Sequence, residues 1–326
     1  MKALITTVPF AEKNKLPLEL LNASSVDYLI NPLNKKLKEY ELCEMISDFD
    51  VLIAGTEPIT EKVLDCATSL KLISRVGIGL DSVDLLSAQN RGIKVSYTPD
   101  APAPAVAELT IGLIFSLLRS IHLSNTQLHE GKWNRIFGKR LAGITIGIIG
   151  VGRIGSRVIR RTKPFGTPRI LVNDIDPTKH SNLDFKLEWA SKQYIYQEAD
   201  IVSLHLPLTS LTKNLLQKQQ LLLMKKDALL INTSRGGIIN EEDLYSVMKS
   251  GHLNGAAIDV FENEPYNGPL KKIERCLLTS HMGSMSVDCR VKMEIEATEE
   301  VIRFASGKNL EGCVPMEEYE VQRLGL

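Results

Sequence analysis

Short runs of aliphatic and β-branched residues recur along the chain, separated by longer stretches of mixed polarity. In Ile144–Ile149 and Ile201–Leu204 the apolar residues follow one another with little interruption. Such runs are typical of strands that are buried on both faces of a parallel sheet. We therefore expect strands at residues 2–7, 26–29, 51–54, 72–76, 144–149, 169–173, 201–204, 228–231, 256–258 and 276–278.

Stretches with helical character separate these strands, for example at residues 35–47, 61–67 and 153–163. Strands that alternate with helices predict parallel α/β units. A further stretch, Ala105–Ile121, is apolar almost all round as far as Arg119. This pattern indicates a helix that is buried between domains or in a subunit contact.

A glycine pattern follows the strand that ends at Ile149 and opens a helix. Gly150 permits a tight turn, Gly152 lets the backbone approach a pyrophosphate, and Gly155 lets the helix pack close to the sheet. The free N–H groups and the positive dipole end of the helix favour phosphate. Strand, turn and helix together predict a dinucleotide-binding site.

The next strand ends at Asp174, about twenty residues beyond the last glycine, where an acid is expected to meet the adenosine ribose. A carboxylate there accepts hydrogen bonds from ribose hydroxyls and repels a 2′-phosphate, so we predict NAD as the cofactor. Asp176 is an alternative ribose ligand, although Pro177 indicates that it already lies in the turn. Arg169 and Lys179 are the nearby bases that would favour a phosphate instead.

The composition shifts to proline and alanine over residues 97–104, which indicates a crossover, and a helix at 286–305 is expected to return to the first domain. We predict an α/β fold of two Rossmann- or flavodoxin-like parallel-sheet domains. The NAD-binding domain, residues 100–285, is inserted into a substrate-binding domain formed by residues 1–99 and 286–326. Two crossovers would give a hinge with a cleft between the domains.

The composition agrees with a two-domain cytoplasmic protein. The chain has 326 residues, and 39 Lys and Arg balance 39 Asp and Glu, so no net field favours nucleic acid or an anionic membrane. The five cysteines show no paired spacing, which indicates reduced thiols and neither a metal site nor a disulfide framework. No signal-peptide core and no apolar stretch long enough to span a bilayer is found.

Three segments near the C-terminal end carry Arg235, Glu264 and His281, in that order. A guanidinium grips a carboxylate through two hydrogen bonds, and a histidine exchanges a proton near neutral pH with a glutamate beside it to hold its tautomer. With a hydride carrier, these groups suffice to interconvert a 2-hydroxy acid and a 2-oxo acid. Taken singly, they also fit a surface arginine, a loop-capping acid and a buried histidine. Their common place after strands favours catalysis.

The chain resembles the D-isomer-specific 2-hydroxyacid dehydrogenases, and most closely the phosphoglycerate-dehydrogenase-like group. The resemblance runs from about Asp50 to Arg303 and rests on the segments 74–81, 106–110, 150–155 and 205–209 and on the three catalytic segments. It implies that Arg235, Glu264 and His281 are catalytic, with substrate contacts from Arg75, Val76, Gly77 and Arg235. It implies cofactor contacts from Gly150, Gly152, Arg153, Ile154, Gly155, Asp174, His205, Pro207, Thr212, Thr233, Asp259, Gly283 and Thr110, and a cytoplasmic homodimer built on the helix after the first crossover.

Two departures from the family pattern bear on the substrate. Bacterial phosphoglycerate dehydrogenases carry an Arg-rich phosphate-binding stretch where this chain has Gly55–Thr60, with Glu57 and no base, and many relatives have Asn where it has Pro102. No serine-binding regulatory domain is expected beyond Leu326. Glyoxylate or hydroxypyruvate reduction is therefore an alternative to phosphoglycerate oxidation. A dinucleotide-sensing corepressor of the same fold is a second alternative. Formate dehydrogenase is a third, although its relatives pair the histidine with glutamine.

Overall fold

The computed structural model describes residues 1–166, 168–177 and 187–325, which form two compact units. The first unit joins Met1–Pro102 to Met285–Leu326, and the second comprises Ala103–Ser284. The limits of these units lie within a few residues of the domain boundaries that we expected. The assignment of substrate binding to the first unit and of NAD binding to the second remains a prediction.

The first unit is built on a parallel sheet of five strands in the order β2-β1-β3-β4-β5, counted over its described residues. This is the order of the flavodoxin-like doubly wound fold. Four strands match the expected runs, whereas β5 was not expected. The strands are β1 (Lys2–Ile5), β2 (Asp27–Ile30), β3 (Val51–Ala54), β4 (Leu72–Arg75) and β5 (Lys94–Tyr97).

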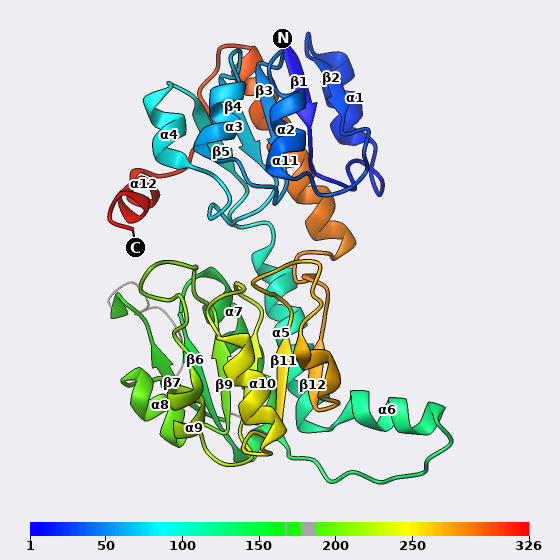
Figure 1. Cartoon of the computed structure of the whole chain (residues 1–326), viewed down its shortest axis with the longest axis vertical. Helices are drawn as coiled ribbons and strands as arrows, with labels where there is room; N and C mark the ends of the chain where they lie inside the picture. Colours follow the sequence, from blue (N-terminus) through cyan, green and yellow to red (C-terminus); the bar gives the residue numbers. More distant parts are fainter. Residues whose placement is uncertain (167, 178–186, 326) are drawn as a thin grey trace. The chain divides into compact units, whose positions relative to one another are not determined.

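Helices cover both faces of this sheet (Figure 1). Residues of α2 (Glu39–Met45), α3 (Glu61–Cys66), α4 (Leu85–Asn90) and α12 (Met316–Arg323) share one apolar core with alternate residues of the strands. The helices α1 (Leu16–Ala23) and α11 (Val287–Ala305) pack together, and α11 lies against β3, β4 and β5. The central strands β3 and β4 are therefore buried on both sides, as uninterrupted apolar runs predict, whereas the edge strand β2 is partly exposed.

The second unit is built on a parallel sheet whose described strands run in the order β12-β11-β10-β9-β6-β7-β8. From β6 the chain adds β7 and β8 on one side and β9 to β12 on the other, which is the Rossmann order. The strand β8 was not expected. The strands are β6 (Thr145–Ile149), β7 (Arg169–Asn173), β8 (Leu187–Trp189), β9 (Ile201–Leu204), β10 (Leu229–Asn232), β11 (Gly255–Ile258) and β12 (Cys276–Leu278).

Successive residues of these strands enter different cores, because side chains alternate between the faces of a sheet. Ile149 packs with α8 (Lys192–Glu198), α9 (Lys218–Leu223) and α10 (Glu241–Lys249), whereas its neighbour Ile148 packs with α5 (Ala103–Leu118) and α7 (Arg153–Thr162). The predicted buried helix at 105–121 corresponds to α5. It ends near Leu118 because Ser120 takes a left-handed conformation, with φ of 50°.

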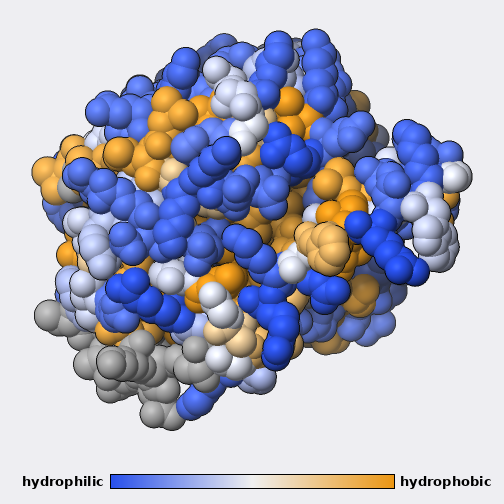
Figure 2. All heavy atoms as spheres, turned by 90° about the horizontal axis from the view of Figure 1, so that it is seen from below, coloured by the Kyte–Doolittle hydropathy of each residue, from blue (hydrophilic) through white to orange (hydrophobic). Residues whose placement is uncertain are grey.

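The segment that follows α5 has little contact with the rest of its unit. Every residue of α6 (Ile121–His129) is described, and none is buried. With residues 131–140, α6 extends away from the sheet (Figure 1). Elsewhere on the surface, apolar residues are exposed among hydrophilic side chains, as in the view of Figure 2. We refer to residues 121–140 as the arm.

Among the described residues, no single helix is long and apolar enough to cross a membrane. The pair formed by α5 and α6 passes the same test of length and composition, but the two helices are bent by 64° where they meet.

Candidate active site

Three neighbouring strands bring the predicted catalytic residues to one edge of the second sheet. Asn232, Ile258 and Leu278, the last residues of β10, β11 and β12, are paired in register. Because the strands are parallel, their carboxyl ends meet at one edge, where ligands bind in open α/β sheets. Arg235, Glu264 and His281 lie in the loops that leave these three ends.

His281 and Glu264 are in direct contact. The Nδ1 atom of His281 lies 3.0 Å from Oε1 and 2.9 Å from Oε2 of Glu264. The side chains are 38% and 26% exposed, so the pair is partly shielded and still reachable from solvent. A carboxylate at Nδ1 accepts a hydrogen bond from that nitrogen, which leaves Nε2 available for proton exchange.

A buried carboxylate fixes the loop that carries His281. Asp259 is 1% exposed, and its Oδ1 accepts hydrogen bonds from the Thr279 hydroxyl at 2.6 Å and the Met282 amide at 2.9 Å. Its Oδ2 accepts one from the Gly283 amide at 3.0 Å. His281 itself has a φ of 51°, and its N–H donates to the Asp259 carbonyl at 2.8 Å. Asp259 and Gly283 were expected to contact the cofactor, and in this structure they hold the loop that carries His281.

Arg235 lies in a turn that packs directly on the loop of Glu264. The side chain of Asn232 donates to the Arg235 carbonyl at 2.9 Å and accepts from the Ser234 hydroxyl at 2.7 Å, which closes the turn. A Cβ atom on Gly236 would lie only 2.0 Å from the Phe261 carbonyl oxygen. Only glycine therefore allows the turn of Arg235 and the loop of Glu264 to approach so closely.

Asn232 was not among the residues that we singled out. The signal was present, because an asparagine at a strand end before Thr233-Ser234-Arg235 is typical of a side chain that hydrogen-bonds its own turn. Its role is to shape the turn that presents Arg235.

The glycine-rich turn between β6 and α7 has the geometry that a bound dinucleotide requires. Gly150 has a φ of 96°, and a Cβ on it would lie 2.2 Å from the His205 carbonyl oxygen. A Cβ on Gly155 would lie 2.0 Å from the Gly150 carbonyl oxygen. Around the Cβ position of Gly152, by contrast, no described atom lies within 4 Å. Gly152 precedes Arg153 and Ile154 at the start of α7, so the helix N-terminus is open to a phosphate group.

Asp174 stands beside this turn, as expected. Its Oδ2 accepts a hydrogen bond from the Val151 amide at 2.7 Å, and its Oδ1 accepts one from the Asp176 amide at 3.1 Å. The carboxylate thus helps to hold the turn and stands where a ribose is expected to bind. Asp176 supplies its backbone to Asp174, which agrees with its position in the following turn.

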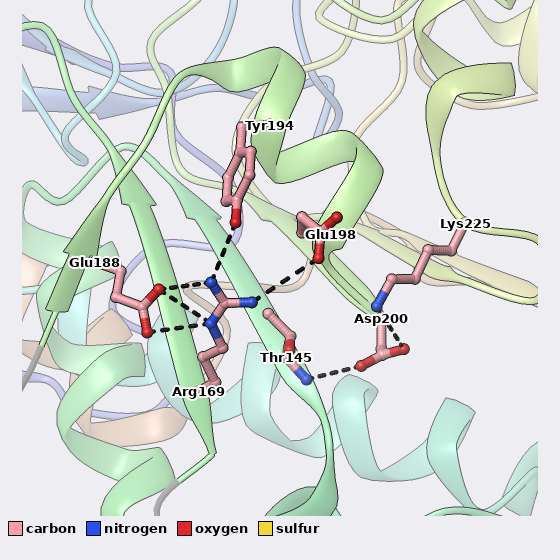
Figure 3. A network of polar contacts seen from close by, with 7 residues as sticks. All are labelled: Thr145, Arg169, Glu188, Tyr194, Glu198, Asp200 and Lys225. Atoms are coloured by element: carbon pink, nitrogen blue, oxygen red, sulfur yellow. Dashed lines mark hydrogen bonds and ion pairs between the residues drawn. The ribbon is translucent and has the colours of Figure 1, made fainter.

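Arg169 cannot serve as the phosphate-binding base that we considered. It begins β7, whereas Asp174 follows the end of that strand, roughly 16 Å away at about 3.3 Å per residue. Its guanidinium is paired with Glu188 at 2.6 Å and with the Tyr194 hydroxyl at 3.4 Å (Figure 3). It lies in the network at the opposite, amino edge of the sheet, with Asp200 and Thr145 nearby (Figure 3). Lys179 lies outside the described residues.

His205 follows β9, next to the glycine-rich turn. Its Nε2 lies 2.9 Å from the Ser203 hydroxyl, and its buried Nδ1 has no hydrogen-bond partner among the described atoms. Burial lowers the pKa of His205 to about 3, so the ring is neutral. Nearby, the Thr212 hydroxyl donates to the Pro207 carbonyl at 2.7 Å and shapes the loop that they share.

Thr110 and Thr233 contact each other, with their hydroxyls 2.9 Å apart. Thr110 is fully buried and also donates to the Val106 carbonyl at 2.8 Å. Thr110 thus offers no exposed surface to a cofactor, and its partner Thr233, directly after β10, is 5% exposed.

In the first unit, Val76 and Gly77, which directly follow β4, were expected to contact the substrate. The Val76 amide donates to the Ala54 carbonyl at 2.9 Å, and the Gly77 amide donates to the Thr98 hydroxyl at 2.8 Å. Both N–H groups are engaged within the unit in this structure, and the substrate contacts of Val76 and Gly77 remain a prediction. Arg75 is 5% exposed, and its guanidinium donates to the Val76 carbonyl.

Glu57, which stands where a phosphate clamp was considered, points into the first unit. It is 1% exposed and accepts hydrogen bonds from the Thr6 hydroxyl and, at 3.0 Å, from the Gly55 amide. Its carboxylate therefore stabilises the loop.

In the described part of the chain, no group of three His, Cys, Asp or Glu residues could hold a metal ion.

Comparison with known proteins shows what the whole chain is similar to. Residues 111–283 match the family model described as "D-isomer specific 2-hydroxyacid dehydrogenase, NAD binding domain". A hydroxypyruvate reductase of Thermotoga maritima is 35% identical over 277 residues, which cover 83% of this chain and 89% of that protein. A D-3-phosphoglycerate dehydrogenase of Methanocaldococcus jannaschii is 36% identical over 295 residues, 89% of this chain but only 56% of that protein. A crystal structure of a Thermus thermophilus protein superposes with a TM-score of 0.87 at 32% identity and covers 97% of this chain and 100% of that one.

Proposed function

Because the chain belongs to the D-isomer-specific 2-hydroxyacid dehydrogenase family, we propose that Arg235, Glu264 and His281 catalyse the interconversion of a D-2-hydroxy acid and its 2-oxo acid. The chain is an NAD-dependent oxidoreductase. The observation that carries the residue assignment is the double contact of Glu264 with the Nδ1 atom of His281, at 3.0 and 2.9 Å.

The proposed division of labour follows from the chemistry of the three side chains. In reduction, protonated His281 gives the proton on Nε2 to the carbonyl oxygen, and Glu264 stabilises the imidazolium. In oxidation, neutral His281 takes the proton from the hydroxyl group. Arg235 holds the substrate carboxylate through two parallel hydrogen bonds and lowers the cost of charge on the neighbouring oxygen. When NAD is bound, its nicotinamide ring supplies or accepts the hydride.

The second unit fits NAD at its carboxyl edge. The open backbone at Gly152 and the start of α7 suit the pyrophosphate, and Asp174 suits the ribose hydroxyls. On the same sheet, β6 and the three catalytic strands are separated by two to four strand spacings, roughly 10–19 Å at about 4.8 Å each. An extended dinucleotide that starts at the glycine-rich turn would therefore lead toward Arg235 and His281.

For the substrate, we propose a small 2-oxo acid such as glyoxylate or hydroxypyruvate. Glu57 turns its carboxylate inward, and the segment Gly55–Thr60 contains no base for a phosphate. Arg75 remains a candidate for contact with one anionic group of the substrate. Phosphohydroxypyruvate should thus not be favoured by more than about tenfold in kcat/KM, which corresponds to about 1.4 kcal/mol.

Steady-state rates with NADH and glyoxylate, hydroxypyruvate or phosphohydroxypyruvate test this proposal side by side. A preference of about a thousandfold for the phosphorylated acid, some 4 kcal/mol, would show that a basic site exists and that phosphoglycerate is the substrate. Turnover of none of the acids would favour the alternative of a dinucleotide-sensing binding protein, which the enzyme names of the relatives do not support.

We also propose that the protein is a homodimer and that the arm forms part of the contact. Ile121 and Leu128 are 52% and 55% exposed, Trp133 is 77% exposed, and Phe137 is fully exposed. Large apolar side chains that are exposed together mark interaction surfaces. Sedimentation of the wild type and of Trp133→Lys with Phe137→Lys tests this, and a wild-type monomer would contradict it.

A cytoplasmic location is proposed from the cysteines. All five are free thiols, two of them buried, which agrees with a reducing compartment. Fractionation of cells that express the tagged protein tests the location, and recovery from an oxidising compartment would contradict it.

A further inference from the structure

The loop that follows β11 positions Glu264. Glu264 lies beyond the end of β11, and its Oε1 accepts a hydrogen bond from the Phe261 amide at 3.1 Å. The rings of Phe261 and Tyr266 stack with centroids 4.1 Å apart, which closes the loop on itself. Phe261 is buried in the core of the second unit, whereas Glu262 and Asn263, which lead from it to Glu264, are exposed. A further anchor on this exposed stretch would help to set the place of Glu264 relative to His281.

One anchor is Glu241, the first residue of α10. Its Oε1 accepts a hydrogen bond from the Glu262 amide at 2.8 Å. We propose that Glu241 is a positioning residue, whose hydrogen bond to this amide holds Glu264 at the distance from His281 that proton exchange requires. The proposal rests on the catalytic roles given above to Glu264 and His281.

The helix that carries Glu241 is itself fixed. Its cap, Asn240, accepts a hydrogen bond from the Asp243 amide at 3.0 Å, and the Asp243 carboxylate accepts one from the Lys218 amide at 2.9 Å. On its inner face, Leu244 and Met248 are buried in the core of the second unit. A side chain on such a helix holds a flexible loop more precisely than another loop would.

The surroundings of Glu241 make a carboxylate costly there. The residue is partly buried, and burial raises its pKa, as do the neighbouring acids Glu262, Glu242 and Glu264. The positive end of α10 offsets part of this cost. The hydrogen bond from the Glu262 amide gives a reason for an acceptor at this place, because without it the exposed stretch before Glu264 would lose its bond to α10.

The test compares three changes at this position. Glu241→Met removes the acceptor at nearly constant volume, Glu241→Ala removes it with the side chain, and Glu241→Gln keeps an oxygen that can accept the bond. We expect kcat for glyoxylate or hydroxypyruvate to fall by roughly ten- to hundredfold in the Met and Ala variants, since small displacements of a catalytic group have effects of that order. The Kd for NADH should stay within about twofold, and Gln should restore most of the rate. Glu242→Ala, which changes an exposed neighbouring acid, is the matched control.

A double-mutant cycle separates positioning from general destabilisation. If Glu241 acts through Glu264, then Glu241→Met should cost less than about twofold in a Glu264→Ala background, because the group that it positions is gone. If the effects of Glu241→Met and Glu264→Ala on kcat multiply in the double mutant, the proposal is overturned. A kcat of Glu241→Gln as low as that of Glu241→Met would also overturn it. If either replacement at Glu241 fails to fold, the Gln variant and the other replacement still give both comparisons.

The same series distinguishes this inference from the function on which it rests. An active His281→Ala enzyme would mean that the catalytic assignment is wrong. If His281→Ala and Glu264→Ala are strongly impaired but still measurable, and Glu241→Met retains the wild-type kcat, the assignment stands and only the role of Glu241 is overturned.

Discussion

Glu264 faces the Nδ1 atom of His281 with both of its carboxylate oxygens, at 3.0 and 2.9 Å. This double contact fixes the orientation of the imidazole ring, because a flipped ring would turn a carbon atom toward the carboxylate. It also favours the tautomer with hydrogen on Nδ1, so that the neutral ring presents an unprotonated Nε2.

Removal of the imidazole should separate binding from turnover. We expect His281→Ala to bind NADH almost normally and to lose roughly 10²- to 10⁴-fold in kcat, the usual contribution of a general acid. NADH fluorescence titration and steady-state rates measure the two effects. Turnover close to that of the wild type would mean that the proton donor lies elsewhere.

Replacement of Arg235 by lysine tests the two-pronged grip. The ammonium keeps the charge but cannot form two parallel hydrogen bonds with a carboxylate. We expect a steep rise in the substrate KM together with a lower kcat, measured at saturating NADH. Arg153→Lys in α7, which is assigned to the cofactor, is the matched control, because its effect should appear in the NADH KM. Substrate kinetics of Arg235→Lys within about twofold of the wild type would exclude a bidentate role.

Asp174 is expected to set a preference for NADH over NADPH. Asp174→Ala should shrink this preference chiefly by weakening NADH, since both the ribose acceptor and the bond to the Val151 amide are lost. Asp174→Asn keeps an acceptor oxygen for that amide and separates the two contributions. Equal use of both cofactors by the wild type would show that the carboxylate does not discriminate a ribose 2′-hydroxyl from a 2′-phosphate.

His205 should make the stability of the protein depend on pH. Its pKa is about 3 in the folded chain against 6.5 for the ordinary residue, so the unfolded chain binds an extra proton between these values. The contribution of His205 is thus complete above about pH 6.5 and is lost as the pH falls toward 3, by at most about 1.4 kcal/mol per pH unit.

Denaturant titrations between pH 4.5 and 7.5 measure this slope. His205→Gln should flatten it, whereas His129→Gln, at an exposed position of α6, should not. An unchanged slope in His205→Gln would mean that the buried ring does not govern the acid limb.

The strands could be predicted from sequence where burial on both faces leaves an unbroken apolar run, as in Thr145–Ile149. The strand β8 was missed because Leu187-Glu188-Trp189 is short and mixed, as an edge strand with one exposed side can be. The helix expected at 35–47 begins only at Glu39, because the Glu41 carboxylate accepts the Lys38 amide at 2.8 Å and fixes the start there.

The site could be predicted as a set of residues, but its internal contacts could not. The order β12-β11-β10, which gathers Arg235, Glu264 and His281, is a matter of strand pairing that no local pattern encodes. The amides of Val76 and Gly77 donate to Ala54 and Thr98, which lie about twenty residues away in the chain. Sequence proximity gives no warning of such partners.

The buried carboxylate of Asp259 should slow the hydrogen exchange of the amides that are bonded to it. Met282 and Gly283 lie in a loop, yet their amides are bonded to a group that is 1% exposed. They should therefore exchange with solvent as slowly as the amides of β11, while that of exposed Asn263 exchanges quickly. A loop that is already ordered loses no further conformational entropy when a substrate binds. In the proposed mechanism, His281 therefore has its position for proton exchange before the acid binds.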